Sequence, residues 1–218
     1  MTTFDGVIFD LDGTLLDSMG VWEEVDRSFL GARNIPVPED YMRAVGALSF
    51  HEAAEYTIRR FSLQERPEDL TAEWHAMAQR EYQEKVPLKS GALAFLTLLR
   101  QREIPMAVAT ASDPLLYRPA LHRIGILDWF HSFTSLQEVG GVKGQPEIYL
   151  RAAEKMKLLP ERCFVFEDLY AGLFAAKRAG FQTAAVYDAC APQEQELLRK
   201  TADLYLLDFT DPRLYTLL

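Results

Sequence analysis

Two aspartates, Asp10 and Asp12, follow directly on a short apolar run near the start of the chain. Residues 7–9 (VIF) form that run, and their β-branched and aromatic types predict a buried strand. Burying a carboxylate costs free energy unless the group is paired or binds a metal, so two acids at this point need an explanation. A surface turn is one, since Asp and Gly both favour turns. A metal-dependent phosphoryl-transfer site is the other, and it requires further polar groups elsewhere in the chain.

Polar side chains also occur where other predicted strands end. The run IPMAVATA at 104–111 contains Thr110 near its end, and CFVFED at 163–168 ends in Glu167 and Asp168. Lys143 lies in the loop GGVKGQP, just before a predicted helix. In open α/β sheets, ligands bind beyond the carboxyl ends of the strands. We therefore expect these side chains and the two aspartates to converge on one rim.

After residue 88 the sequence alternates between helix-like and strand-like segments. Five strands are expected there, at 104–111, 131–136, 163–168, 183–188 and 203–209, and the N-terminal strand at 7–9 belongs to the same sheet. Five helices are expected between them, at 90–103, 115–125 (closed by Gly125), 146–157, 169–180 and 192–200. Such alternation predicts an α/β fold, a Rossmann-like doubly wound parallel sheet with right-handed crossovers.

Residues 15–87 interrupt this alternation. Apolar residues recur at helical spacing in three segments, 21–34, 49–61 and 71–85, and the stretch contains no convincing strand. We interpret it as an inserted all-helical cap domain, with residues 1–14 and 88–218 forming the core. Hinges are expected near residues 15–17 and 87–90.

Composition excludes several classes of protein. The net charge of −9 over 218 residues argues against a general nucleic-acid binder, which usually has a basic face. No stretch approaches the length of a membrane span, and the N-terminus has no signal-peptide pattern, so a cytoplasmic protein is expected. Of the two cysteines, Cys163 begins an apolar run and is expected to be reduced in the core.

Four segments carry a family resemblance. DLDGTL at 10–15, Thr110 after its strand, Lys143 before PEIYL, and FEDLYAGLFAAKRAGF at 166–181 resemble the four motifs of the haloacid dehalogenase-like (HAD) superfamily. The resemblance covers essentially the whole chain and includes the position of a helical cap after the first motif. It is strongest to subfamily I with a helical C1 cap, which includes phosphoglycolate phosphatase and β-phosphoglucomutase.

The resemblance implies a role for each motif residue. Asp10 would be the nucleophile that forms an aspartyl-phosphate, and Asp12 the general acid and base. Thr110 would hydrogen-bond the transferring phosphoryl group. Lys143 would neutralise charge on Asp10 and on the phosphoryl oxygens.

The same resemblance implies a Mg²⁺ cofactor. Asp10, the Asp12 backbone carbonyl and Asp168 would be its ligands, with Glu167 as an outer partner. Hard oxygen ligands of this kind suit Mg²⁺.

Two positions depart from the motifs. Motif three commonly reads GKPxPD, whereas residues 142–147 read VKGQPE, so Gly144 is expected to loosen the loop. Leu169 stands where serine usually follows the acidic pair, which would remove a supporting hydroxyl. Neither departure removes a charge that the chemistry needs.

The predicted function is a Mg²⁺-dependent phosphatase that acts on a small phosphorylated metabolite and is a monomer or weak dimer. Its cap would close over the site and exclude bulk water. The residues expected to contact the substrate come from the cap and from the end of the second strand. They are Trp22, Arg43, Ser49, Phe50, Ala111 and Ser112.

Alternatives within and outside this class remain. A phosphomutase is less favoured, because β-phosphoglucomutases typically carry a histidine shortly after motif one and an arginine in a cap loop, which the matching segments DSMGVWEE and GALSFHE lack. A receiver-like phospho-switch is disfavoured by the DxDGT spacing and the long insertion. An idle binding protein would have no physical reason to keep these costly charges together.

Overall fold

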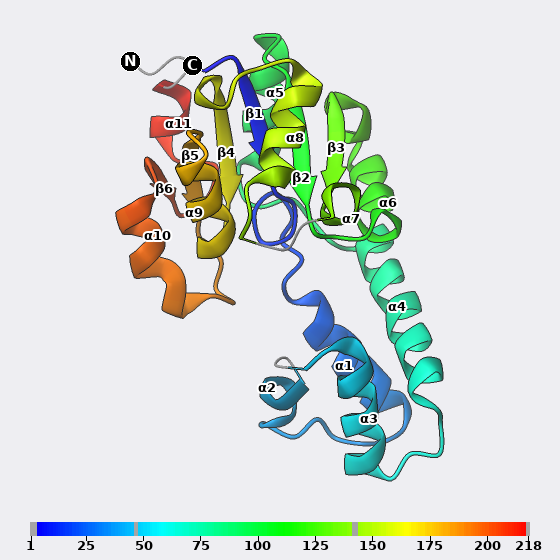
Figure 1. The fold of residues 1–218 in the computed structure, drawn as a ribbon. Helices are drawn as coiled ribbons and strands as arrows, with labels where there is room; N and C mark the ends of the chain where they lie inside the picture. The colour runs from blue at the N-terminus through cyan, green and yellow to red at the C-terminus, as the bar shows by residue number, and fades with distance from the viewer. Residues whose placement is uncertain (1–3, 46–47, 141–143, 217–218) are drawn as a thin grey trace. The chain divides into compact units, whose positions relative to one another are not determined.

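The computed structural model describes residues 4–45, 48–140 and 144–216, drawn as a ribbon in Figure 1. The chain divides into two compact units. Residues 1–19 and 86–218 form one, here called the core unit, and residues 20–85 form the other, here called the cap unit.

The core unit is built on a six-stranded sheet in which every neighbouring pair is parallel, as the alternation of elements predicts. The strands are β1 (Gly6–Phe9), β2 (Met106–Thr110), β3 (Ser132–Ser135), β4 (Cys163–Glu167), β5 (Gln182–Val186) and β6 (Leu204–Leu206). Their order is β3-β2-β1-β4-β5-β6. After β1, the chain adds β2 and β3 on one side of it and then β4, β5 and β6 on the other. The strands that carry the candidate groups, β1, β2 and β4, are therefore adjacent in the middle of the sheet.

Seven helices are described in the core unit, of which α5 to α10 lie between strands along the chain and α11 follows the last strand (Figure 1). They are α5 (Ala92–Gln101), α6 (Pro114–Ile124), α7 (Leu136–Val139), α8 (Glu147–Met156), α9 (Tyr170–Arg178), α10 (Gln195–Thr201) and α11 (Pro212–Thr216). Gly125 closes α6 with a φ of 82°, as expected of a left-handed cap. The four- and five-residue helices α7 and α11 were not predicted, since one turn is too short to show a helical period.

Successive side chains of β1 point to opposite faces of the sheet, and each face has its own core. Ile8 packs with Val165 and with residues of α8, which crosses one face. Phe9 faces the other way into an aromatic cluster, with ring centroids 5.0 Å from Phe166 and 6.3 Å from Phe95 of α5. Burial on both faces explains why the strand is continuously apolar.

The cap unit is helical where the structure describes it. Its helices are α1 (Val21–Ala32), α2 (Tyr41–Val45), α3 (Phe50–Phe61) and α4 (Pro67–Glu84). The last starts four residues before its predicted beginning, because Pro67 occupies the first helical position, where the fixed φ of proline favours a helix. Trp74 packs edge-on against Phe29 and Phe50, with centroids 5.5 and 5.6 Å apart, which joins three helices.

Asp26 is a half-buried acid on α1. Burial and, to a smaller extent, the charge of Glu23 raise its pKa from 3.8 to about 6. The folded cap therefore prefers the protonated form, and this contribution to stability is lost as pH rises from about 4 through 6. We expect Asp26→Asn to leave the free energy of unfolding unchanged below pH 4 and to raise it by about 1 kcal/mol at pH 8, after discounting for solvent screening. Urea unfolding at both pH values measures this, and an equal gain at both would show that ionisation is not the cause.

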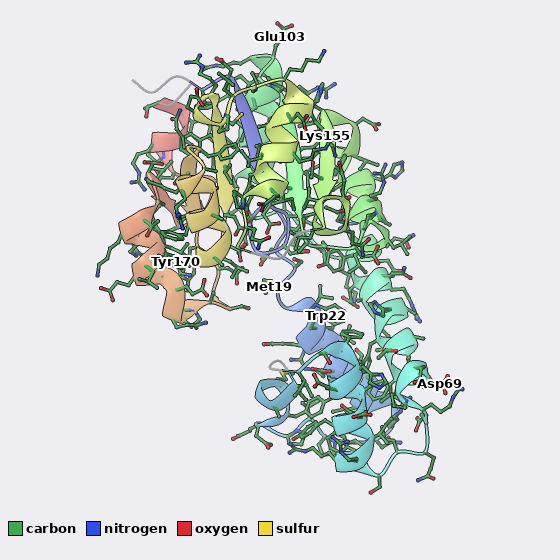
Figure 2. The ribbon with its side chains drawn as sticks, in the orientation of Figure 1. Met19, Trp22, Asp69, Glu103, Lys155 and Tyr170 are labelled. Carbon is green, nitrogen blue, oxygen red and sulfur yellow. The ribbon has the colours of Figure 1, made fainter. Side chains whose placement is uncertain are left out.

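The two linkers between the units are hydrogen-bonded to each other within the core unit. Leu16 and Leu88 form an antiparallel bridge. The Lys89 N–H donates to the Leu15 carbonyl at 2.8 Å, and the Asp17 N–H to the Pro87 carbonyl at 3.0 Å. Met19, labelled in Figure 2, is the last residue of the core unit before the cap. The boundaries between the two units, at 19/20 and 85/86, thus lie on the cap side of the segments expected as hinges, 15–17 and 87–90.

Lys89 also anchors the second linker to the loop after β5. Its Nζ lies 2.5 Å from Asp188 Oδ2, with the two side chains only 13% and 4% exposed. The other oxygen of Asp188 accepts the Cys190 N–H at 2.8 Å. Removing one partner of a buried ion pair is strongly destabilising, because the other charge is left unpaired. The pair therefore holds the second linker beside the carboxyl end of β5.

Cys163 and Cys190 are both thiols, Cys163 buried as expected and Cys190 exposed. Among the described residues, no helix has the length and apolar character needed to cross a membrane.

Candidate active site

Three buried carboxylates meet at the carboxyl ends of β1 and β4. Asp10 is 3% exposed, and Glu167 and Asp168 are each 1% exposed. One oxygen from each of these residues, here called the acidic trio, lies within 4.8 Å of the others. The register explains their meeting, because Phe9 pairs with Phe166 and the next residue of each strand continues to the same edge.

The turn after Asp10 is fixed by backbone hydrogen bonds. The Thr14 and Leu16 N–H groups both donate to the Leu11 carbonyl, at 3.2 and 2.7 Å. Gly13 adopts a φ of +81°, and a Cβ there would lie 2.4 Å from Asp168 Oδ2. Glycine is thus required twice, for its backbone conformation and for the approach of the carboxylate.

Two hydroxyls of this segment orient the aspartates. Thr14 Oγ1 donates to Asp168 Oδ1 at 2.9 Å, and Ser18 Oγ donates to Asp12 Oδ1 at 2.6 Å. Asp12 is only partly buried, unlike the acidic trio. Its position two residues after Asp10 and its partial exposure suit a group that exchanges protons with a substrate.

Glu167 is held at both carboxylate oxygens. Tyr149 OH donates to Oε1 at 3.0 Å, and the Leu169 N–H donates to Oε2 at 2.8 Å. Burial, followed by the charges of Glu167 and Asp10, raises the pKa of Tyr149 well above its usual value. Because this bond comes from the backbone of Leu169, the leucine that replaces the usual serine still holds Glu167.

Thr110 lies at the end of β2, 2% exposed, and its Oγ1 accepts the Ser112 N–H at 3.2 Å. Beside this strand end is a hollow of about 10 Å³, enough for about one water molecule. Its lining includes Asp10, Glu167, Ala111 and Gly144. Gly144 has a φ of +96°, so the motif-three departure is a glycine in a conformation that favours glycine.

For the substrate-contact residues predicted in the cap, the structure shows which other residues of the cap unit they contact. Trp22 at the start of α1 (Figure 2) lies 5.1 Å from Phe50 between ring centroids. Ser49 caps α3 in a reciprocal capping box with Glu52, which gives it a structural role at the helix start. Arg43 belongs to α2, but its side chain is outside the described part of the structure.

Lys143, the predicted catalytic cation, falls on residues 141–143, outside the described residues. Its placement therefore stays a prediction from the motif.

The acidic trio fits a hard divalent cation. Three buried carboxylates in contact range repel one another, and a metal ligated by their oxygens offsets that cost. Oxygen-only donors favour Mg²⁺, Ca²⁺ or Mn²⁺ over softer metals.

Three supporting residues were not predicted: Thr14, Ser18 and Tyr149. Thr14 is part of the first motif, and Tyr149 lies within PEIYL, on the buried face of the predicted helix. Helical spacing could have placed that phenol in the core, but its partner 18 residues away follows only from how α8 packs on the sheet.

Comparison with known proteins shows the family of this chain. The model of the haloacid dehalogenase-like hydrolase family matches residues 4–180. Hexitol phosphatase A of Escherichia coli is 30% identical over 183 residues, covering 83% of this chain and 82% of the relative. The phosphorylated carbohydrates phosphatase of Thermotoga maritima is 27% identical over 178 residues, covering 82% of each protein.

The fold is also that of known structures. A β-phosphoglucomutase-like protein of Thermotoga maritima superposes with a TM-score of 0.86 at 26% identity, covering 98% of both chains. With the family model spanning most of the sequence, the chain belongs to the haloacid dehalogenase-like hydrolases, and the prediction of a phosphatase enzyme of that family is confirmed.

Proposed function

We propose that this enzyme hydrolyses a small phosphorylated carbohydrate in a Mg²⁺-dependent reaction through an aspartyl-phosphate on Asp10. The observation that carries the proposal is the acidic trio at the ends of β1 and β4, with the more exposed Asp12 two residues after the nucleophile. The named activities of the relatives, hexitol phosphatase and phosphorylated carbohydrates phosphatase, support this class of substrate.

In the first step, an Asp10 carboxylate oxygen attacks phosphorus while the bond from phosphorus to the sugar oxygen breaks. Asp12 gives its proton to the leaving oxygen, which departs as the alcohol. Ser18 holds Asp12 through its 2.6 Å hydrogen bond and so orients the acid. Carboxylates of ordinary pKa are ionised near neutral pH, and this compensates for their weak nucleophilicity.

In the second step, a water molecule attacks phosphorus and the bond to Asp10 breaks. Asp12, now ionised, takes the proton of that water, so both aspartates return to their starting forms. Thr110, at the neighbouring strand end, would hydrogen-bond the phosphoryl group, and Lys143 would add positive charge beside it. Trp22, Arg43, Ser49 and Phe50 remain the cap residues proposed for the sugar end.

Asp10, Asp168 and the Asp12 carbonyl would hold the Mg²⁺, with Glu167 completing the carboxylate set. The cation would supply positive charge that offsets the carboxylates and the phosphoryl oxygens.

A phosphomutase is the second candidate, favoured by the likeness to the β-phosphoglucomutase-like structure. A mutase passes the phosphoryl group back to a sugar instead of to water, so it yields an isomerised sugar phosphate and depends on a bisphosphate. The leading proposal predicts net phosphate release without any bisphosphate.

We expect phosphate release from hexitol and hexose phosphates to fall to background in EDTA and to return with excess Mg²⁺. A panel that also contains phosphoglycolate and nucleoside monophosphates, assayed for inorganic phosphate, measures this. Release that is unaffected by EDTA would overturn the metal requirement. Isomerisation without release would identify a mutase.

A further inference from the structure

Tyr149 is a buried phenol that ends beside the acidic trio without a task in the two chemical steps. It lies in the first turn of α8 with 3% exposure, and its hydroxyl donates to Glu167 Oε1 at 3.0 Å. Both residues line the hollow that also reaches Asp10. The phenol is therefore placed to act on the metal site through Glu167.

The hydrogen bond from Tyr149 fixes Oε1 of Glu167, the carboxylate oxygen that the Leu169 N–H does not bind. The Leu169 N–H binds Oε2 of Glu167 and comes from the same short segment, so by itself it lets the carboxylate turn about that oxygen. Tyr149 binds the second oxygen from a different helix. Two bonds from separate elements hold the carboxylate plane in one orientation.

Gly172 of α9 packs directly against the hydrogen bond between Tyr149 and Glu167. A Cβ at this position would lie 2.3 Å from Glu167 Oε1 and 2.5 Å from Tyr149 OH. The helix thus approaches so closely that the side chain of any other residue would displace the pair. Such close packing restricts how far the carboxylate can move while the phenol is present.

We propose that Tyr149 is a positioning residue that holds the Glu167 carboxylate in the orientation the metal site requires. The inference rests on the proposed metal-dependent function and adds a determinant of metal affinity to it. Without the phenol hydroxyl, binding a cation would require the carboxylate to be ordered again. Residues that support a metal site from outside its ligand set typically contribute a factor of about 10 to 100 in metal affinity.

The test is Tyr149→Phe in the full chain, with Mn²⁺ as a paramagnetic substitute for Mg²⁺. Free Mn²⁺ measured by electron paramagnetic resonance should give a dissociation constant about tenfold higher than that of the wild type. At saturating Mg²⁺, kcat for p-nitrophenyl phosphate should change less than twofold, and KM for that substrate should not change. The matched control is Tyr117→Phe, which removes a buried phenol whose ring stacks on Phe133 at 5.6 Å.

Asp168→Asn separates this inference from the proposed function. If Asp168→Asn loses Mn²⁺ while Tyr149→Phe binds it as the wild type does, the positioning role is overturned and the metal site stands. An equal weakening in both tyrosine variants would also overturn the role, because it would be a general effect of core packing. A wild type that binds no Mn²⁺ would overturn both proposals.

Discussion

Asp10→Asn is expected to lower kcat/KM for phosphate release by at least about a thousandfold. Asparagine keeps the volume of the side chain but removes the charge and the nucleophilic oxygen, so no aspartyl-phosphate can form. Phosphate release from the best sugar phosphate of the panel measures the effect. The matched control is Asp128→Asn, which changes an exposed aspartate of the core unit and should retain full activity.

The same variant has a second expected result. Neutralising one of three carboxylates within 4.8 Å relieves their repulsion, so the metal-free variant should melt no lower than the wild type. Its thermal shift on adding Mg²⁺ should shrink. Retained activity with a normal melting temperature would exclude Asp10 as the nucleophile.

Gly91→Ala is expected to have the largest effect on stability. Gly91 precedes α5 with a φ of +76°, and a Cβ there would lie 2.6 Å from the backbone carbon of Phe209 and 2.7 Å from the Thr210 nitrogen. Since backbone atoms cannot rotate away, the loop between β6 and α11 must move and lose the bond from the Phe209 N–H to the Ser90 carbonyl. We expect a loss of about 3 kcal/mol in the free energy of unfolding, from left-handed strain and overpacking together.

Gly125→Ala is the matched control, because it has nearly the same φ of +82° but no atom within 4 Å of the added Cβ. It should cost about 1 kcal/mol, the strain alone. Urea unfolding followed by far-ultraviolet circular dichroism compares the two variants. Equal losses would mean that the contact with the Phe209 loop is absent in solution.

The sequence predicts most of the sheet because each strand and its following helix carry local signals. The apolar run before Asp10 and the glycine at 125 mark their elements within a few residues, and strict alternation implies parallel pairing. Motif positions at strand ends then predict which side chains share an edge. The structure brings Asp10, Glu167 and Asp168 together as that reasoning expects.

What the sequence does not predict depends on contacts between distant segments. The bond from Tyr149 to Glu167 requires the register of α8 over the sheet, and the pair of Lys89 and Asp188 joins residues 99 positions apart. Gly144 illustrates the same limit. Its residue type predicts a loosened loop, but nothing local in the sequence predicts the φ of +96° that it adopts.

The paired linkers have a consequence for how this chain can change. Because Leu16 bridges Leu88, the inserted segment leaves and re-enters the core unit at neighbouring points. For the folding of the sheet, the insertion is therefore a loop whose two ends are held together by the core unit itself. The entropy of closing a loop grows only slowly with its length, so insertions of different size or sequence disturb the core little. Residues 20–85 can therefore change in length or sequence as a module, while the paired linkers and the carboxyl edge of the sheet keep their geometry.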